Sequence, residues 1–304
     1  MTGLKIPAFR HHSAHTENKM GKYCILYNSK THNKKSLENA KKVESHLPGS
    51  EFEYRDALSI GSLRDFLEQL PEDTDLIFTG GDGTVNHVIN ELDGYELKRP
   101  LYYYPAGTGN DFINDLGKPL DCDPFPINDY MKHLPTVTVN GKSYKFINAV
   151  GFGLDGYCCE EKDRLVSEGK DMSYTMIAAL GLMYKYKPTN AKATVDGETL
   201  EFSNVWLAPT ALGSFYGGGV KIAPTQKRND PEHLVTCEVL HSCGRLRGAT
   251  IFLDICAGKA EKYPQYINIR RGRHVEVEFD RPVALQIDGE TVLGVTRYAV
   301  DAGV

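Results

Sequence analysis

A glycine-rich segment with one acidic residue, Gly-Gly-Asp-Gly-Thr at residues 80–84, is the part of the sequence best suited to chemistry. It follows an apolar run at 76–78 and precedes apolar residues at helical spacing. Glycine backbones can approach a phosphate closely, and a helix N-terminus favours an anion. Asp82 would repel a phosphate unless a divalent cation such as Mg²⁺ lay between them. The segment therefore predicts a phosphate site with a metal, and a tight capped turn is the alternative.

A second glycine segment, Gly-Thr-Gly-Asn-Asp at residues 107–111, follows the next apolar run. By itself it reads as a turn with Asn110 as a helix cap. Two such loops at neighbouring strand ends are instead placed to hold one polyphosphate between them. The first loop is not a dinucleotide fingerprint, because Asn86 stands where the third glycine would be. Lys142-Ser143 resembles the end of a P-loop, but Thr136 replaces the first glycine of that motif.

Alternating short apolar runs and helical patterns must position these loops. Runs at 23–27, 52–54, 76–78 and 101–104 read as strands separated by helices, which predicts a parallel sheet covered on both faces. After a proline-rich stretch, Asn140-Gly141, Asp196-Gly197 and Asp288-Gly289 mark hairpins. The second half is therefore expected to be mostly antiparallel β, with one helical interlude at about 160–186.

Composition limits the class of protein. The 304 residues predict about two domains, and the net charge of −5 disfavours a dedicated nucleic-acid binder. The seven cysteines include no CxxC pair, so we expect reduced thiols in an intracellular chain. No apolar run is long enough to span a bilayer. We expect a disordered leader at 1–21, an α/β nucleotide-binding domain at 22–133 and a β-rich domain at 134–304.

Taken together, the motifs resemble the diacylglycerol kinase-type lipid kinases, most closely their soluble bacterial members. The resemblance covers nearly the whole chain from about Lys22. It rests on the first loop with Asn86 and Asn90, on Gly-Thr-Gly-Asn-Asp-Phe at 107–112, on residues 148–155, on 217–224 and on Asp288-Gly289-Glu290. It implies an α/β domain and a β-sandwich-like domain with a nucleotide cleft between them.

The family also implies ATP and Mg²⁺ as cofactors and phosphoryl transfer to a lipid hydroxyl, with diacylglycerol as the first expectation. Asp82 would organise Mg²⁺, and Asp288 or Glu290 would be the base, the choice remaining open. Asp155 either joins these carboxylates or is a buried structural residue. The implied nucleotide-binding residues are Asn28, Gly80, Gly81, Asp82, Gly83, Thr84, Asn86, Gly107, Thr108 and Asn110.

The sequence departs from the family at two loops. Residues 28–32 (Asn-Ser-Lys-Thr-His) lack the usual proline and glycine of the first loop. A structural Mg²⁺ site implied at Lys227, Asp230 and Glu232 has Pro231 in place of a glycine, which restricts the backbone.

These features leave alternatives open. An alternative enzyme would keep the fold and phosphorylate another acceptor, namely another glycerolipid, a sphingoid base or NAD. Asn86 and Asn90 argue against NAD. A nucleotide-binding regulatory protein without turnover is the other class. We expect a cytoplasmic protein, peripheral at a membrane, whose partner is the lipid surface; 175–186 is either an interfacial or a buried helix. A homodimer would be ordinary for the family, though no residue marks one.

Overall fold

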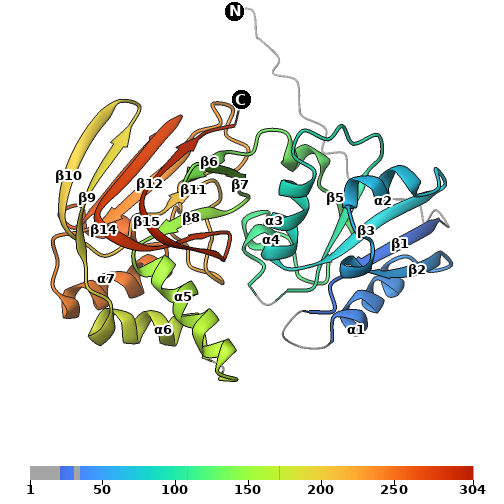
Figure 1. Ribbon diagram of the computed structural model, residues 1–304, viewed down its shortest axis with the longest axis horizontal. Helices are drawn as coiled ribbons and strands as arrows, with labels where there is room; N and C mark the ends of the chain where they lie inside the picture. Colours follow the sequence, from blue (N-terminus) through green and yellow to red (C-terminus); the bar gives the residue numbers. More distant parts are fainter. Residues whose placement is uncertain (1–20, 31–34, 108, 171, 304) are drawn as a thin grey trace, which may run out of the picture.

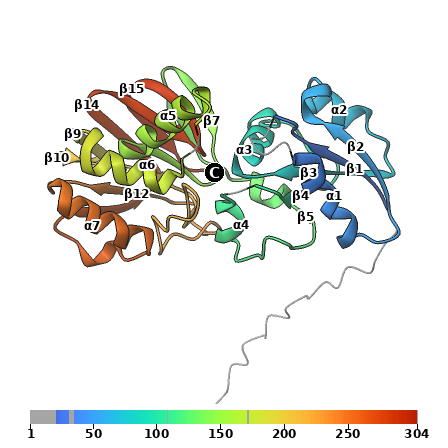
Figure 2. The ribbon, with the colours of Figure 1, turned by 90° about the horizontal axis from the view of Figure 1, so that it is seen from below.

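The computed structural model describes residues 21–30, 35–107, 109–170 and 172–303. The expected leader therefore lies outside the described residues, apart from Gly21. Figures 1 and 2 show two domains side by side, with the helices α3 (Asp82–Glu91) and α4 (Asp111–Asp115) of the first domain turned toward the second. This arrangement confirms the predicted fold class, a parallel α/β domain followed by an antiparallel β domain.

The first sheet has five strands in the order β2-β1-β3-β4-β5. Their bounds are β1 Lys22–Tyr27, β2 Glu51–Asp56, β3 Thr74–Gly80, β4 Leu101–Pro105 and β5 Phe125–Pro126. The first four are parallel, and β5 pairs antiparallel with β4. The carboxyl ends of β3 and β4 therefore lie next to each other, and both glycine loops begin there.

Helices cover both faces of this sheet, as the alternation of apolar residues predicts. Ile25 and Ile77 pack with the residues of α1 and η1, whereas Leu26 and Phe78 pack with α2 and α3. The helices of the first domain are α1 Ser36–Lys41, η1 Lys42–His46, η2 Ala57–Ser59, α2 Leu63–Gln69, α3 Asp82–Glu91, α4 Asp111–Asp115 and η3 Asn128–Met131.

The second sheet has ten strands and is antiparallel. The long strand β14 pairs with β15, β8 and β9, so the sheet branches at this strand. The bounds are β6 Thr136–Val139, β7 Lys142–Lys145, β8 Ala149–Phe152, β9 Thr189–Val195, β10 Glu198–Val205, β11 Thr210–Ala211, β12 Val235–Leu240, β13 Ile267–Gly272, β14 His274–Ile287 and β15 Glu290–Asp301.

The three predicted hairpins all form, each with positive φ at both turn residues, including Asp288 at 47° and Gly289 at 97°. Positive φ at both positions is the type I′ geometry that suits a two-residue hairpin. The third hairpin joins β14 to β15 and carries Asp288-Gly289-Glu290 toward the first domain. All seven cysteines are free thiols, as expected.

Helices pack on one face of the second sheet (Figure 2). They are α5 Leu154–Ser167, α6 Tyr174–Leu180, η4 Gly181–Lys185, α7 Arg245–Cys256 and η5 Ala260–Lys262. The predicted interlude at 160–186 is therefore divided into separate helices, and α7 was not predicted. Within the described residues, no helix is both long and apolar enough to cross a membrane.

Candidate active site

The two glycine loops touch each other backbone to backbone. A β-carbon at Gly107 would lie 2.3 Å from the Gly81 Cα, and one at Gly81 would lie 3.0 Å from the Gly107 Cα. The Ala106 amide also donates to the Gly80 carbonyl oxygen at 2.8 Å. Only glycine permits this approach, so the predicted pairing of the loops has a direct structural basis.

The side chain of Asp82, at the start of α3, binds backbone amides at the end of the second glycine loop. Its carboxylate accepts hydrogen bonds from the Asp111 and Phe112 amides at 2.9 and 3.0 Å. It also accepts one from the Asn148 side-chain amide of the second domain at 3.0 Å. A carboxylate at the start of α4 satisfies amides that the helix leaves free. Asp82 therefore ties both loops and both domains together.

Asp111 is a second acidic residue of this region, and the sequence alone does not predict it as a site residue. It is buried, and its carboxylate accepts the Gly218 and Gly219 amides at 2.8 and 2.7 Å. Burial and the nearby Asp82 charge raise the pKa of Asp111 to about 7, although the two amides oppose this shift. The sequence could have indicated this residue, because Asp111 lies in the motif at 107–112 and binds the motif at 217–224, and both motifs belong to the family resemblance.

Asp288, at the tip of the β14–β15 hairpin, accepts four hydrogen bonds. The donors are the Asn86 side chain at 2.9 Å and the amides of Ile147, Asn148 and Ala149 at 2.6, 2.8 and 3.0 Å. Burial raises the pKa of Asp288, and the four donors oppose the shift because they stabilise the ionised form. The carboxylate thus fixes the segment between β7 and β8 against α3.

Glu290 lies beyond this turn and is exposed. Its Oε1 atom lies 3.7 Å from the position that a β-carbon on Gly83 would take. Among the residues that the structure describes, none donates a hydrogen bond to this carboxylate. Glu290 therefore presents a free carboxylate next to the N-terminal turn of α3.

Two asparagines of α3 bind the second domain. Asn90 donates to the Lys145 carbonyl oxygen at 2.9 Å and accepts the Lys145 amide at 2.8 Å. Asn86 donates to Asp288, as described above, and its predicted contact with a nucleotide stays a prediction. Both residues help to set the position of α3 against β7.

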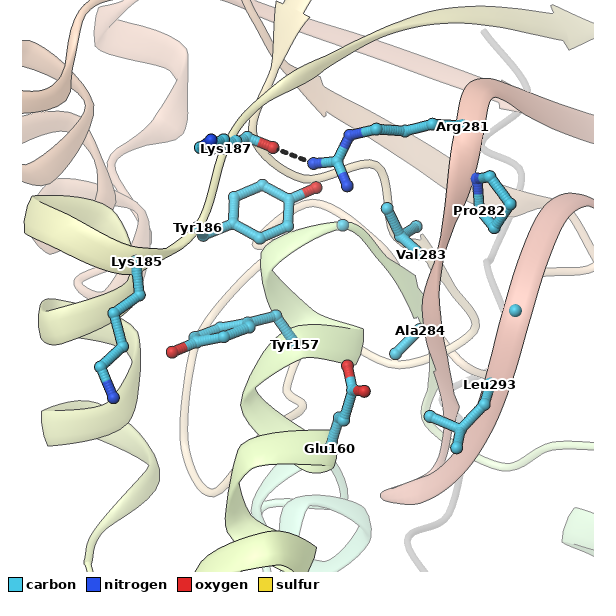
Figure 3. A pocket seen from close by; sticks show the side chains of 12 residues that line it. Tyr157, Glu160, Lys185, Tyr186, Lys187, Arg281, Pro282, Val283, Ala284 and Leu293 are labelled. Atoms are coloured by element: carbon cyan, nitrogen blue, oxygen red, sulfur yellow. Dashed lines mark hydrogen bonds between the residues drawn. The ribbon is translucent and has the colours of Figure 1, made fainter.

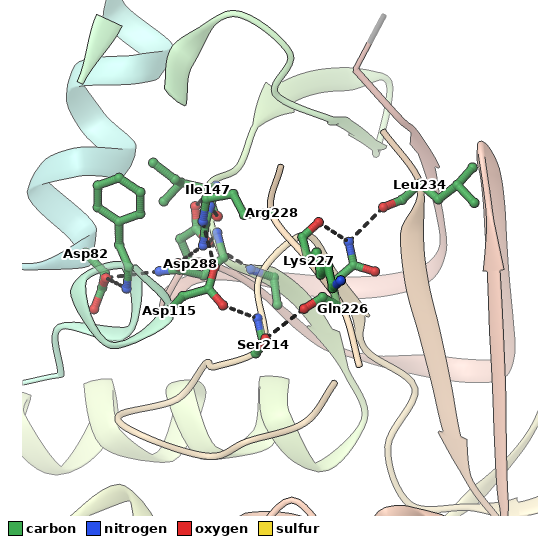
Figure 4. A network of polar contacts seen from close by, with 12 residues as sticks. Asp82, Asp115, Ile147, Ser214, Gln226, Lys227, Arg228, Leu234 and Asp288 are labelled. Atoms are coloured by element: carbon green, nitrogen blue, oxygen red, sulfur yellow. Dashed lines mark hydrogen bonds and ion pairs between the residues drawn. The ribbon is translucent and has the colours of Figure 1, made fainter. Parts of the chain in front are cut away.

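A buried ion pair extends this network (Figure 4). The Arg228 Nε lies 2.7 Å from the Asp115 Oδ2, and the two side chains are 6% and 4% exposed. Arg228 also donates to the Ile147 carbonyl oxygen and to the Asn148 Oδ1. Arg228 thus links α4 to the segment that Asp288 holds. Sequence reasoning missed its role, because its partners are distant in the chain.

We expect Arg228→Ala to lower the free energy of unfolding by about 3–5 kcal/mol, because it leaves the Asp115 carboxylate buried without its partner. Arg297→Ala is the control, since Arg297 pairs with Glu276 at the surface. It should cost less than about 1 kcal/mol. Urea denaturation measures both. Equal losses in the two variants would contradict this role of Arg228.

The remaining predicted nucleotide residues lie at the same edge of the first sheet or in its loops. Asn28 follows β1 and accepts the Lys30 amide at 2.9 Å. Asn110 has a positive φ of 52°, and its buried Oδ1 atom has no hydrogen-bond partner in the described structure. That orphaned oxygen suits a donor group on a ligand. Thr108 lies outside the described residues.

Among the described residues, no hydrogen bond links Asp155 to the carboxylates above. Its Oδ1 accepts the Tyr216 hydroxyl at 2.6 Å in the core of the second domain. Burial raises the pKa of Asp155 to about 7. Its Oδ2 atom is buried and has no hydrogen-bond partner in the described structure, so both roles predicted for Asp155 stay predictions.

The loop implied to hold a structural metal does not fit one in this arrangement. Asp230 forms an ion pair with Arg271, and its other oxygen accepts the Glu232 amide at 3.1 Å. The Lys227 carbonyl oxygen accepts the Asp230 amide at 3.1 Å. Within the described chain, no group of three His, Cys, Asp or Glu residues is arranged for a metal. The guanidinium of Arg271 already neutralises Asp230, so no step below depends on a metal here.

We expect Gly107→Ala to abolish measurable nucleotide binding, because its β-carbon would overlap the backbone of Gly81 and separate the loops. Gly244→Ala is the matched control, since nothing lies within 4 Å of its β-carbon position. Calorimetric titration with ATP and Mg²⁺ checks both variants. Unchanged affinity in Gly107→Ala would show that the contact between the loops is not needed.

Comparison with known proteins agrees with this geometry. The model of the diacylglycerol kinase catalytic domain matches residues 22–136, and that of the YegS C-terminal NAD kinase beta sandwich-like domain matches residues 148–300. Both glycine loops lie within the first match, and most of the β domain that faces them lies within the second, so the chain is a two-domain kinase. The chain belongs to the diacylglycerol kinase-type family of lipid kinases.

Individual relatives support the same family. A diacylglycerol kinase of Bacillus subtilis is 28% identical over 222 residues, covering 71% of this chain and 70% of the relative. YtlR of the same organism, named only as a candidate lipid kinase, is 32% identical over 49% of this chain and 53% of its own. The crystal structure of a diacylglycerol kinase from Bacillus anthracis shares the fold, with a TM-score of 0.61 at 20% identity over 94% of this chain and 95% of that one.

Proposed function

We propose that this lipid kinase transfers the γ-phosphate of ATP, with Mg²⁺, to the hydroxyl of diacylglycerol, forming phosphatidate. The observation that carries the proposal is the meeting of three parts. The touching glycine loops, the Asp82 carboxylate and the free Glu290 carboxylate converge at the N-terminus of α3. Phosphoryl transfer needs these parts, namely phosphate-binding amides, a metal-organising carboxylate and a base.

Glu290, in this proposal, is the base, and Asp288 is a positioning residue. Four donors already occupy the Asp288 carboxylate, whereas Glu290 is exposed. A base must reach the proton that it removes, and Glu290 is free to do so. Asp288 holds the hairpin from which Glu290 extends.

The chemical step follows from these positions. The acceptor hydroxyl gives its proton to Glu290, and its oxygen forms a bond to the γ-phosphorus. The bond from that phosphorus to the β–γ bridging oxygen breaks, and its electron pair leaves with ADP. When bound, Mg²⁺ neutralises charge on the phosphates, and Asp82 would organise it. The free Oδ1 atom of Asn110 is available to the nucleotide.

The acceptor is a membrane lipid, so the proposal places the protein at the cytoplasmic surface of a bilayer while it works. Its relatives named diacylglycerol kinase support this choice of acceptor. A different glycerolipid or a sphingoid base would leave the chemistry of the site unchanged.

We expect wild-type protein to transfer label from [γ-³²P]ATP to diacylglycerol in mixed micelles, and Glu290→Gln to lower kcat about 10²–10⁴-fold. The same tripeptide at Asp196-Gly197-Glu198 provides the matched control. Glu198→Gln, at a hairpin turn where Glu198 pairs with Arg270, should leave kcat unchanged.

The outcomes separate the alternatives. Label in another lipid would correct the acceptor and keep the mechanism. ATP binding without label in any lipid would contradict the kinase proposal and favour a regulatory protein. Full activity in Glu290→Gln would contradict the assignment of the base.

A further inference from the structure

A pocket of about 330 Å³ lies between α5, the segment after η4 and the edge of the β14–β15 ribbon (Figure 3). The register of these strands shifts between Glu278 and Val283, and again between Val283 and Leu285. This irregularity is where Arg281 and Pro282 leave regular pairing and become exposed. The same ribbon carries Glu290 at its tip, and the pocket lining includes none of the residues of the proposed site.

Cations gather at this pocket. Lys185, Lys187 and Arg281 line it, against Glu160 as its acidic lining residue. Arg281 donates to the Lys187 carbonyl oxygen and lies over the Tyr186 ring, 5.8 Å from its centre. These contacts hold the guanidinium at the pocket and leave other N–H groups for a ligand.

The two lysines differ in their availability. The Lys185 Nζ lies 3.2 Å from the Glu161 Oε1, which partly neutralises it. Among the described residues, the Lys187 ammonium has no side-chain partner. The lining is therefore net positive, with Lys187 and Arg281 as the groups free to bind an anion.

Tyr186 gives a second, independent indication of a ligand. Its side chain is 5% exposed, and its buried hydroxyl has no hydrogen-bond partner in the described structure. In Figure 3 this hydroxyl points toward Arg281 and Val283. Buried polar groups without a partner are rare, because each costs stability until a ligand or water satisfies it. A phosphate oxygen at the pocket would accept this hydroxyl.

Apolar side chains border the cationic groups. Val283 and Ala284 line the pocket, together with Leu293, which is 61% exposed. Tyr184, next to Lys185 in the chain, is 74% exposed. Exposed apolar and aromatic groups beside cations are typical of a surface that meets an anionic bilayer.

We propose that this pocket binds the phosphate headgroup of an anionic phospholipid that is not the reacting lipid. Lys187 and Arg281 contact the phosphate, Tyr186 donates to it, and Leu293 lies against the acyl region. The proposal rests on the proposed function only in that the enzyme works at a bilayer. Such a contact would hold the β14–β15 hairpin, and with it Glu290, close to the membrane surface.

Sedimentation with phosphatidylcholine vesicles, with and without about 30% phosphatidylglycerol, tests this in the full chain. We expect binding that requires phosphatidylglycerol and falls at least about tenfold in Lys187→Ala/Arg281→Ala. Lys22→Ala/Arg55→Ala, which removes two exposed cations from the first domain, is the matched control and should bind normally. Tyr186→Phe should weaken binding about threefold without changing charge.

The results have separate meanings. Equal binding by the two double variants, or wild-type binding that ignores phosphatidylglycerol, would overturn the proposal. If glycerol phosphate protects the 185–187 amides from hydrogen exchange but the protein does not bind vesicles, the ligand of the pocket is a soluble phosphate compound. That result would overturn the assignment of a lipid. Activity in detergent micelles is measured in parallel and should persist in Lys187→Ala/Arg281→Ala. Failure of the kinase proposal would appear there and not in the vesicle assay.

Discussion

Carboxylates that accept backbone amides across the domain boundary are the constraint on which this structure depends. Asp82 binds the start of α4 and Asn148, and Asp288 binds three successive amides and Asn86. Hydrogen bonds to charged groups are stronger than those between neutral groups. The two aspartates therefore fix the loops of one domain against the hairpin of the other.

This use of the aspartates changes how the site is understood. From the sequence, Asp82 in a phosphate loop is expected to bind a metal, and Asp288 at a hairpin tip is a candidate for the base. In the structure both residues first build the site. The groups that accept no hydrogen bond within the described structure are the Glu290 carboxylate and the buried Asn110 Oδ1. In the third hairpin, construction and chemistry are thus divided between Asp288 and Glu290, whereas Asp82 would serve both.

The sequence predicted the parts of the fold that local rules determine. Glycine at residues 80, 81, 83 and 107, Asn-Gly or Asp-Gly at the hairpins and the apolar periodicity each carry a local signal. The pairing of Arg228 with Asp115 joins residues 113 positions apart, and no local pattern marks it. The structural metal site at 227–232 was implied by the family resemblance. The ion pair that neutralises Asp230 depends on where β13 places Arg271, which the sequence does not show. The sequence of α7 shows no clear helical spacing of apolar residues, because Leu246 and Leu253 are apolar but lie on the exposed face of the helix.

Hydrogen exchange of the Ile147, Asn148 and Ala149 amides in Asp288→Asn tests the central claim most directly. If the Asp288 carboxylate assembles the site, the three amides should exchange at least about tenfold faster than in wild type. Asp196→Asn is the control, because Asp196 accepts the Arg273 and His274 amides at the equivalent hairpin. It should affect those two amides and leave 147–149 unchanged. Unaltered exchange at 147–149 in Asp288→Asn would contradict the account.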